Sequence, residues 1–89
     1  PLMLQDILPD LSQLPDQEYF NTVIWEAIEQ ALEEMPTEQR EVFVWHEFDD
    51  VSFKEMTKRT GESQNTLLSR KRYAILFLRK KLRQLYEEL

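Results

Sequence analysis

The side chains best suited to chemistry gather in one short stretch, residues 60–73, whose sequence is TGESQNTLLSRKRY. Small polar side chains follow a glycine, and three consecutive bases come next. In the major groove of DNA, arginine pairs with guanine, asparagine with adenine and serine with either. The backbone amides at the start of a helix also favour phosphate. If this stretch opens a helix, it predicts contact with DNA.

The charge of the chain is divided between its two halves. The chain has 89 residues and a formal net charge of −6. Residues 1–50 hold thirteen acids and one base, Arg40, whereas residues 51–89 hold four acids and ten bases. Such asymmetry is typical of proteins that contact nucleic acids or membranes. The alternative is that the acidic half and the basic half pair with each other inside the molecule.

The remaining composition argues against most other kinds of site. The chain has no cysteine, one glycine and one histidine, His46. It therefore lacks a thiol nucleophile, a glycine-rich phosphate loop and the further ligands that a zinc site needs. No apolar run approaches membrane-spanning length. We expect a cytoplasmic, non-enzymatic protein without a membrane partner, a metal or a cofactor.

Proline and apolar spacing divide the chain into an arm and a helical domain. Residues 1–15 contain three prolines and predict a linker or docking arm, and residues 16–89 predict the domain. Because the chain begins with proline, we expect it to be a piece of a longer protein. The first helix is expected from about Gln17 to Met35, after Asp16 as its N-cap. The second is expected from Thr37, a candidate N-cap, to about Glu47.

The second half predicts a helix-turn-helix. Residues 52–55, Ser-Phe-Lys-Glu, fit the capping box that begins a helix. This short third helix is expected to end at Thr60, and Gly61 suits the left-handed residue that follows a helix. Ser63 is the expected cap of a fourth helix from about Gln64 to Glu87. The predicted fold is an all-α, four-helix domain with a C-terminal helix-turn-helix.

At 100° per residue, the fourth helix has two unlike faces. One side carries the aliphatic residues that we expect in the core: Leu67, Ala74, Leu78, Leu82 and Leu85. The opposite side is polar and basic near the helix start, with Asn65, Ser69, Arg72 and Tyr73, and with Thr66 and Arg70 toward its edge. Lys71 falls within the aliphatic side, so we expect its stem along the core and its ammonium in solvent.

From Met35 to Leu82 the sequence resembles region 4 of bacterial sigma factors, most closely the extracytoplasmic-function (ECF) group. The resemblance is carried by the segments MPTEQREVFVWHEF, VSFKEMTKRTGES and NTLLSRKRYAILFLRKKL. It implies a subunit of RNA polymerase that recognises the −35 promoter element. It also implies contact with the beta-flap of the polymerase core. An anti-sigma factor is a further candidate partner.

The resemblance also assigns roles to residues by position. The residues that it directs toward the DNA groove are Thr66, Leu68, Ser69, Arg72 and Tyr73. The residues that it sets near the DNA backbone are Lys58, Arg59, Arg70 and Lys71. Gln64 and Asn65, at the helix start, complete the expected DNA-binding residues. The chain departs from the family pattern at Arg59, Thr60, Leu68, Lys71 and Tyr73, and two of these departures bear on the choice of base. Leu68 stands where a base is usual and Tyr73 replaces a common arginine, which favours contact with a thymine methyl group over pairing with guanine.

Three alternatives remain open at this point. Arg70 is expected to pair with Glu55 across two helices, with or without a phosphate contact. The domain as a whole could be a helix-turn-helix regulator of another class, which acts as a dimer on paired half-sites. It could also be a protein-binding helical module, in which residues 75–77, Ile-Leu-Phe, form the docking patch.

Overall fold

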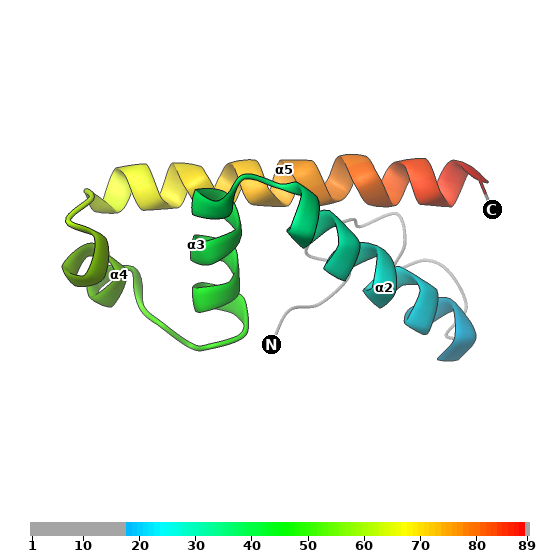
Figure 1. The fold of residues 1–89 in the computed structure, drawn as a ribbon, viewed down its shortest axis with the longest axis horizontal. Coiled ribbons are helices and arrows are strands. Elements are labelled where there is room, and N and C mark those ends of the chain that lie inside the picture. Colours follow the sequence, from blue (N-terminus) through cyan, green and yellow to red (C-terminus); the bar gives the residue numbers. More distant parts are fainter. Residues whose placement is uncertain (1–17, 89) are drawn as a thin grey trace.

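The long C-terminal helix organises the domain. The computed structural model describes residues 18–88, which form α2 (Glu18–Glu34), α3 (Thr37–Glu47), α4 (Phe53–Thr60) and α5 (Gln64–Glu88). The first three helices lie along one side of α5 (Figure 1). The predicted all-α architecture with a C-terminal helix-turn-helix is confirmed. The predicted arm, residues 1–15, and the predicted cap Asp16 lie outside the described residues.

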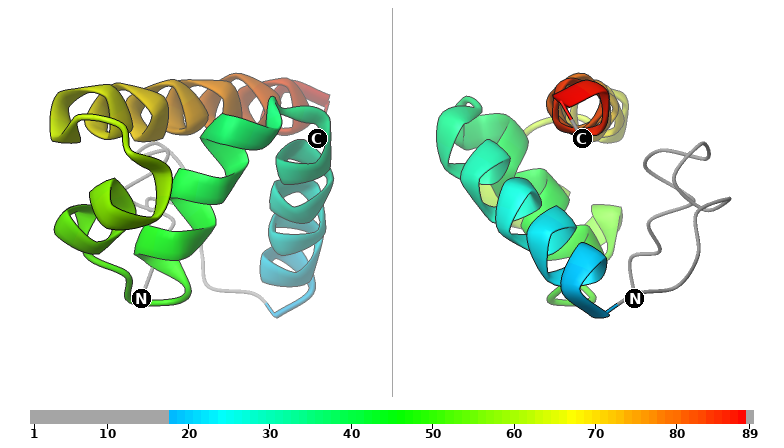
Figure 2. Two further views of the ribbon diagram at one scale, coloured as in Figure 1. Left: turned by 60° about the vertical axis from the view of Figure 1, so that its left-hand side comes forward. Right: turned by 90° about the vertical axis from the view of Figure 1, so that its right-hand side faces the viewer.

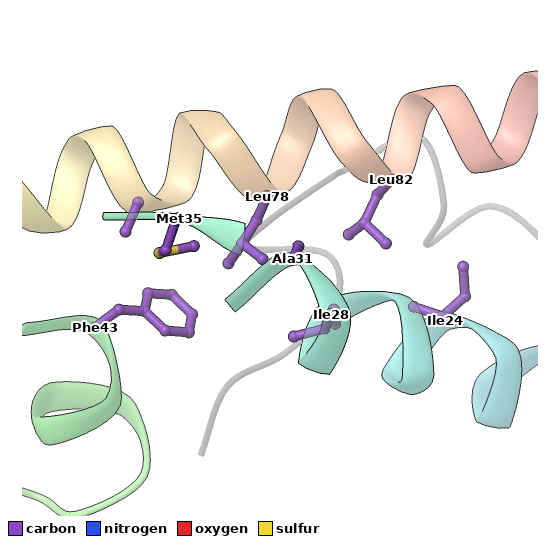
Figure 3. Packing of buried hydrophobic residues seen from close by; sticks show 8 residues of the cluster. Ile24, Ile28, Ala31, Met35, Phe43, Leu78 and Leu82 are labelled. Carbon is purple, nitrogen blue, oxygen red and sulfur yellow. The ribbon is translucent and has the colours of Figure 1, made fainter. Parts of the chain in front are cut away.

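The larger core cluster joins α2 to the second half of α5. Side chains on α2 recur every three or four residues, so they form one apolar stripe. This stripe meets the aliphatic stripe of α5, and Figure 3 shows the side chains pointing toward one another. The cluster is almost fully buried and consists of Ile24, Ile28, Ala31, Met35, Phe43, Ala74, Leu78 and Leu82. Burial of each large aliphatic side chain contributes about 1.5–3 kcal/mol.

A smaller cluster joins α3, α4 and the start of α5 through Val42, Met56 and Leu67. Val42 and Phe43 are neighbours in the sequence, yet they belong to different clusters. Successive side chains on a helix point about 100° apart, so α3 lies between the two clusters and contributes to both. Figure 2 shows α3 between α4 and α2. The two tryptophans lie at the cluster edges and are partly buried.

The start of α3 differs from the prediction. Pro36, not Thr37, occupies the N-cap position, with φ −55° and ψ 140°. The Pro36 carbonyl accepts hydrogen bonds from the N–H groups of Gln39 and Arg40, at 3.1 and 3.0 Å. Thr37 is therefore the first helical residue, and its predicted role as N-cap is wrong. The ring of Pro36 holds φ at a value that suits an extended residue directly before a helix.

The caps of the helix-turn-helix agree with the sequence. The Ser52 hydroxyl accepts from the Glu55 N–H at 3.1 Å. Gly61 follows α4 with φ 76°, in the left-handed region. Ser63 accepts from the Thr66 N–H at 3.1 Å and donates to the Thr66 hydroxyl at 2.9 Å. The second contact of the capping box, between the Glu55 carboxylate and the Ser52 N–H, is replaced by an ion pair. The Glu55 carboxylate lies 3.5 Å from Arg59 Nε instead.

Replacing Gly61 with alanine tests the turn. A Cβ at this position meets nothing within 4 Å, so the cost comes only from the left-handed backbone. We expect Gly61→Ala to lower the free energy of unfolding by about 1–2 kcal/mol. Gly61→Asn should cost less, because asparagine tolerates this conformation better. Urea unfolding of the three proteins measures both values, and equal stability of the glycine and alanine forms would contradict the assignment.

One ion pair links α2 to the last turns of α5. Lys81 Nζ lies 2.9 Å from a carboxylate oxygen of Glu34. The hydrogen bond from Lys81, and then its positive charge, lower the pKa of Glu34 below the ordinary value of 4.5. A lowered carboxyl pKa means that the charged form is favoured in the folded state. The pair therefore stabilises the fold above pH 4.5, and this contribution is lost as pH falls through the folded-state pKa of Glu34.

Removal of the Lys81 amine should reverse this shift. We expect Lys81→Ala to raise the pKa of Glu34 toward 4.5, because both the hydrogen bond and the positive charge are gone. An NMR titration of the Glu34 carboxyl carbon measures the change. Lys80→Ala is the matched control, since Lys80 is an exposed lysine next in sequence. An unchanged Glu34 titration in Lys81→Ala would show that the ion pair does not form in solution.

Candidate nucleic-acid interface

The first turns of α5 expose a mixed polar and basic surface. The aliphatic side of the helix is sealed, since Leu67 and Ala74 are both 0% exposed. The expected outward orientation of the opposite side is confirmed. Its exposed side chains are Gln64, Asn65, Leu68, Ser69, Arg72 and Tyr73. Thr66 is half-buried, and its hydroxyl is held by Ser63 at the helix start.

Helix α4 adds two bases beside this surface, and they differ in their contacts. Lys58 is exposed and forms no ion pair with any described side chain. Arg59 lies 3.5 Å from Glu55, and its guanidinium lies 5.5 Å from the centroid of the Trp45 ring. Arg59 therefore holds α4 against α3, whereas Lys58 keeps its charge available for an outside partner.

Arg70 links three segments of the chain. Its Nη2 lies 3.6 Å from a Glu38 oxygen at the start of α3 and 3.6 Å from a Glu62 oxygen in the turn before α5. The predicted pairing with Glu55 is wrong, because Glu55 lies beside Arg59 on the same helix. The Arg70 side chain is 22% exposed. A contact between Arg70 and phosphate would thus compete with two carboxylates.

Lys71 turns inward to the end of α3. Its side chain is 14% exposed, and its ammonium donates to the Glu47 carboxylate and contacts His46 Nδ1. The expectation that this ammonium lies in solvent is therefore wrong. The last turn of a helix carries negative partial charge and unpaired carbonyls, which favour a cation there. The His46 ring lies in that last turn, and its centroid is 4.5 Å from the centroid of the Phe53 ring.

These positions give the predicted site residues two different environments. The exposed residues on the outward side of α5 and the exposed Lys58 of α4 are grouped under one name, the α5 outer face: Lys58, Gln64, Asn65, Leu68, Ser69, Arg72 and Tyr73. Arg59, Arg70 and Lys71 instead pair with acids of the same chain. Arg72, like Lys58, forms no ion pair with the described side chains.

Comparison with known proteins identifies the family. A model of the family described as sigma-70, region 4, matches residues 25–78, which is more than half of the chain. The chain belongs to the sigma-70 region 4 family. The matched range begins within α2 and includes α3, α4 and every residue of the α5 outer face. No curated protein and no solved structure matches the chain.

The family gives the exposed surface a biological setting. Region 4 is a DNA-binding, non-enzymatic domain. In sigma factors it binds DNA at the −35 promoter element and is associated with RNA polymerase. None of the helices between residues 18 and 88 is long and apolar enough to cross a membrane. The helix-turn-helix inferred from the caps and Gly61 is consistent with this family of DNA-binding domains.

The sequence analysis did not predict that the α5 outer face of this region 4 domain extends further along the helix. A hollow on this side of α5 is lined by Leu68, Lys71, Arg72, Ile75, Leu76 and Arg79. The predicted docking patch at residues 75–77 is divided, because Ile75 and Phe77 pack on the larger core cluster and only Leu76 is exposed. The spacing of Leu68, Arg72 and Leu76, four residues apart, could have revealed this row.

The inward pairing of Lys71 with Glu47 can be measured without DNA. We expect Lys71→Met and Glu47→Gln to show a coupling of about 1 kcal/mol in unfolding free energy, because each variant removes one charge of the pair. Urea unfolding of the parent, both single variants and the double variant gives the coupling. Purely additive effects would mean that Lys71 does not bind Glu47 in solution.

Proposed function

We propose that this region 4 domain recognises the −35 promoter element as part of an ECF-type sigma factor, and so directs RNA polymerase to begin transcription in the cytoplasm. The observation that carries the proposal is the α5 outer face, which lies on the second helix of a capped helix-turn-helix and holds Asn65, Ser69 and Arg72 away from the core. Family membership supplies the setting in which such a surface acts.

The dimensions of α5 support entry into the major groove. An α-helix with side chains is about 10–12 Å wide, and the major groove is about 12 Å wide. Near the helix start, Asn65 and Ser69 are short, so the backbone can approach the base edges closely. Arg72, two turns along, has the length and the donors to pair with guanine O6 and N7. The first-turn amides of Gln64 and Asn65, which precede the capped Thr66 amide, favour a phosphate at the rim.

The ion pairs indicate different roles for the basic residues. Lys58 and Arg72 carry charge that no described acid neutralises, so we assign them to a phosphate and to a base respectively. Arg59, Arg70 and Lys71 hold α4, the turn and α5 in place through acids of the same chain. Their contribution to DNA binding would then be the positioning of the helix-turn-helix.

The acidic half of the chain favours a domain whose binding to DNA depends on a protein partner. Exposed acids on α2 include Glu26, Glu29 and Glu33, and they repel phosphate. We therefore propose that affinity for DNA alone is modest. Attachment to the polymerase core, through its beta-flap, would raise the effective concentration of the domain at the promoter. The core is the proposed protein partner, and an anti-sigma factor is a second.

Replacing Arg72 and Lys58 separates base contact from phosphate contact. We expect Arg72→Ala to weaken binding at one base pair by about 1–3 kcal/mol and to relax the preference there. Lys58→Ala should weaken all sequences alike and reduce the slope of log affinity against log salt by about 0.9. Fluorescence anisotropy on a panel of single-base-pair variants of a selected DNA sequence, at several salt concentrations, measures both effects.

Two outcomes would count against this assignment. An equal loss on every sequence for Arg72→Ala would show that Arg72 contacts the backbone and not a base. A lower salt slope for Lys71→Met, comparable to that of Lys58→Ala, would show that Lys71 reaches phosphate despite its inward contacts. Both Lys58 and Arg72 are exposed, so circular dichroism of their variants should match the parent.

A further inference from the structure

Leu68 occupies a position that the hydrophobic core does not explain. Its side chain is 46% exposed, whereas the adjacent Leu67 is 0% exposed and belongs to the smaller core cluster. The exposed neighbours of Leu68 on the helix are polar, namely Gln64, Asn65 and Arg72. The core does not use the exposed part of Leu68, so this part of the side chain is available to an apolar group of a partner that binds the α5 outer face.

We propose that Leu68 determines specificity by contacting the C5-methyl group of a thymine in the DNA bound by α5. This inference rests on the proposed function and adds to it the identity of one base. Leucine has no donor or acceptor, so it cannot pair with the polar edges of bases. The thymine methyl is the one apolar group that a base pair presents in the major groove, and cytosine carries only a hydrogen at the same C5 position.

The spacing of Leu68 and Arg72 relates this thymine to a second base. Residues four apart lie on the same side of a helix, and the rise between them is about 6 Å. Successive bases on one strand are about 3.4 Å apart. The two side chains can therefore contact base pairs about two steps apart or closer. A guanine for Arg72 and a thymine for Leu68 should thus lie near each other in the bound element.

The surroundings favour DNA over a protein as the partner of Leu68. Leu76 is the other leucine exposed on α5, at 45%, and it lies eight residues further along. That distance is about 12 Å along the axis, and the exposed guanidinium of Arg72 stands between the two. The two leucines line the same hollow on α5, but they are not neighbours on the helix. Leu68, unlike Leu76, lies within the first turns, where a recognition helix meets base edges.

The test removes one methyl group at a time from the DNA. A preferred duplex is first selected from random sequences with the 89-residue chain at low ionic strength. Each thymine in it is then replaced by uracil, which lacks only the C5-methyl group. We expect one replacement to weaken binding about fourfold, the effect of one buried methyl group, as measured by fluorescence anisotropy. In Leu68→Ala the same replacement should have no effect, whereas Leu68→Met should retain it.

Leu76→Ala is the matched control, because it removes an equally exposed leucine from the same helix. It should keep the full uracil effect. The inference is overturned if no thymine position shows the effect, or if the effect persists in Leu68→Ala. It is also overturned, in favour of protein docking, if both leucine variants weaken binding to polymerase core and uracil has no effect.

Failure of this inference is distinguishable from failure of the proposed function. A preferred sequence that depends on Arg72, without any uracil effect, would leave promoter recognition standing and remove only the role of Leu68. Absence of any preferred sequence, with the core polymerase present or absent, would overturn both. Because Leu68 is exposed, its variants should keep the parent circular dichroism spectrum, which confirms that losses of affinity arise at the surface.

Discussion

The burial of one side of α5 is the constraint on which the rest of the structure depends. Leu67 fixes the start of this helix against α3 and α4, while Leu78 and Leu82 fix its second half against α2. Together these contacts set the rotation of the helix about its own axis. A rotation by one residue would bring Leu68 inside and turn Leu67 to solvent. The chemistry of the outer face thus follows from apolar packing on the opposite side.

Charge in the second half of the chain serves two purposes at once. The sequence left open whether its bases face DNA or pair with the acidic half, and the structure divides them residue by residue. Arg70 and Lys71 pair with acids that precede α5 in the chain, and so attach α5 to α3. Lys58 and Arg72 are exposed and form no ion pair with the described acids. Pairing within the chain thereby positions the bases that stay accessible.

The sequence predicted the features that depend on near neighbours. The caps at Ser52 and Ser63 and the left-handed Gly61 involve residues within one turn, so local rules were sufficient. It failed where a side chain meets a distant segment. The carboxylate that binds Lys71 lies 24 residues away, and its position is set by the angle at which α3 meets α5. Helical periodicity identifies a face, but it does not identify what the next helix brings to that face.

The length of α5 has a mechanical consequence. The helix is unbroken over 25 residues, which corresponds to about 37 Å. Its first turns pack in the smaller core cluster and its second half packs in the larger one. It therefore joins the two clusters through one continuous element. A displacement of α2 would act on α5 at the end remote from the outer face. Contacts made far from DNA would in this way alter the angle at which the helix meets the duplex.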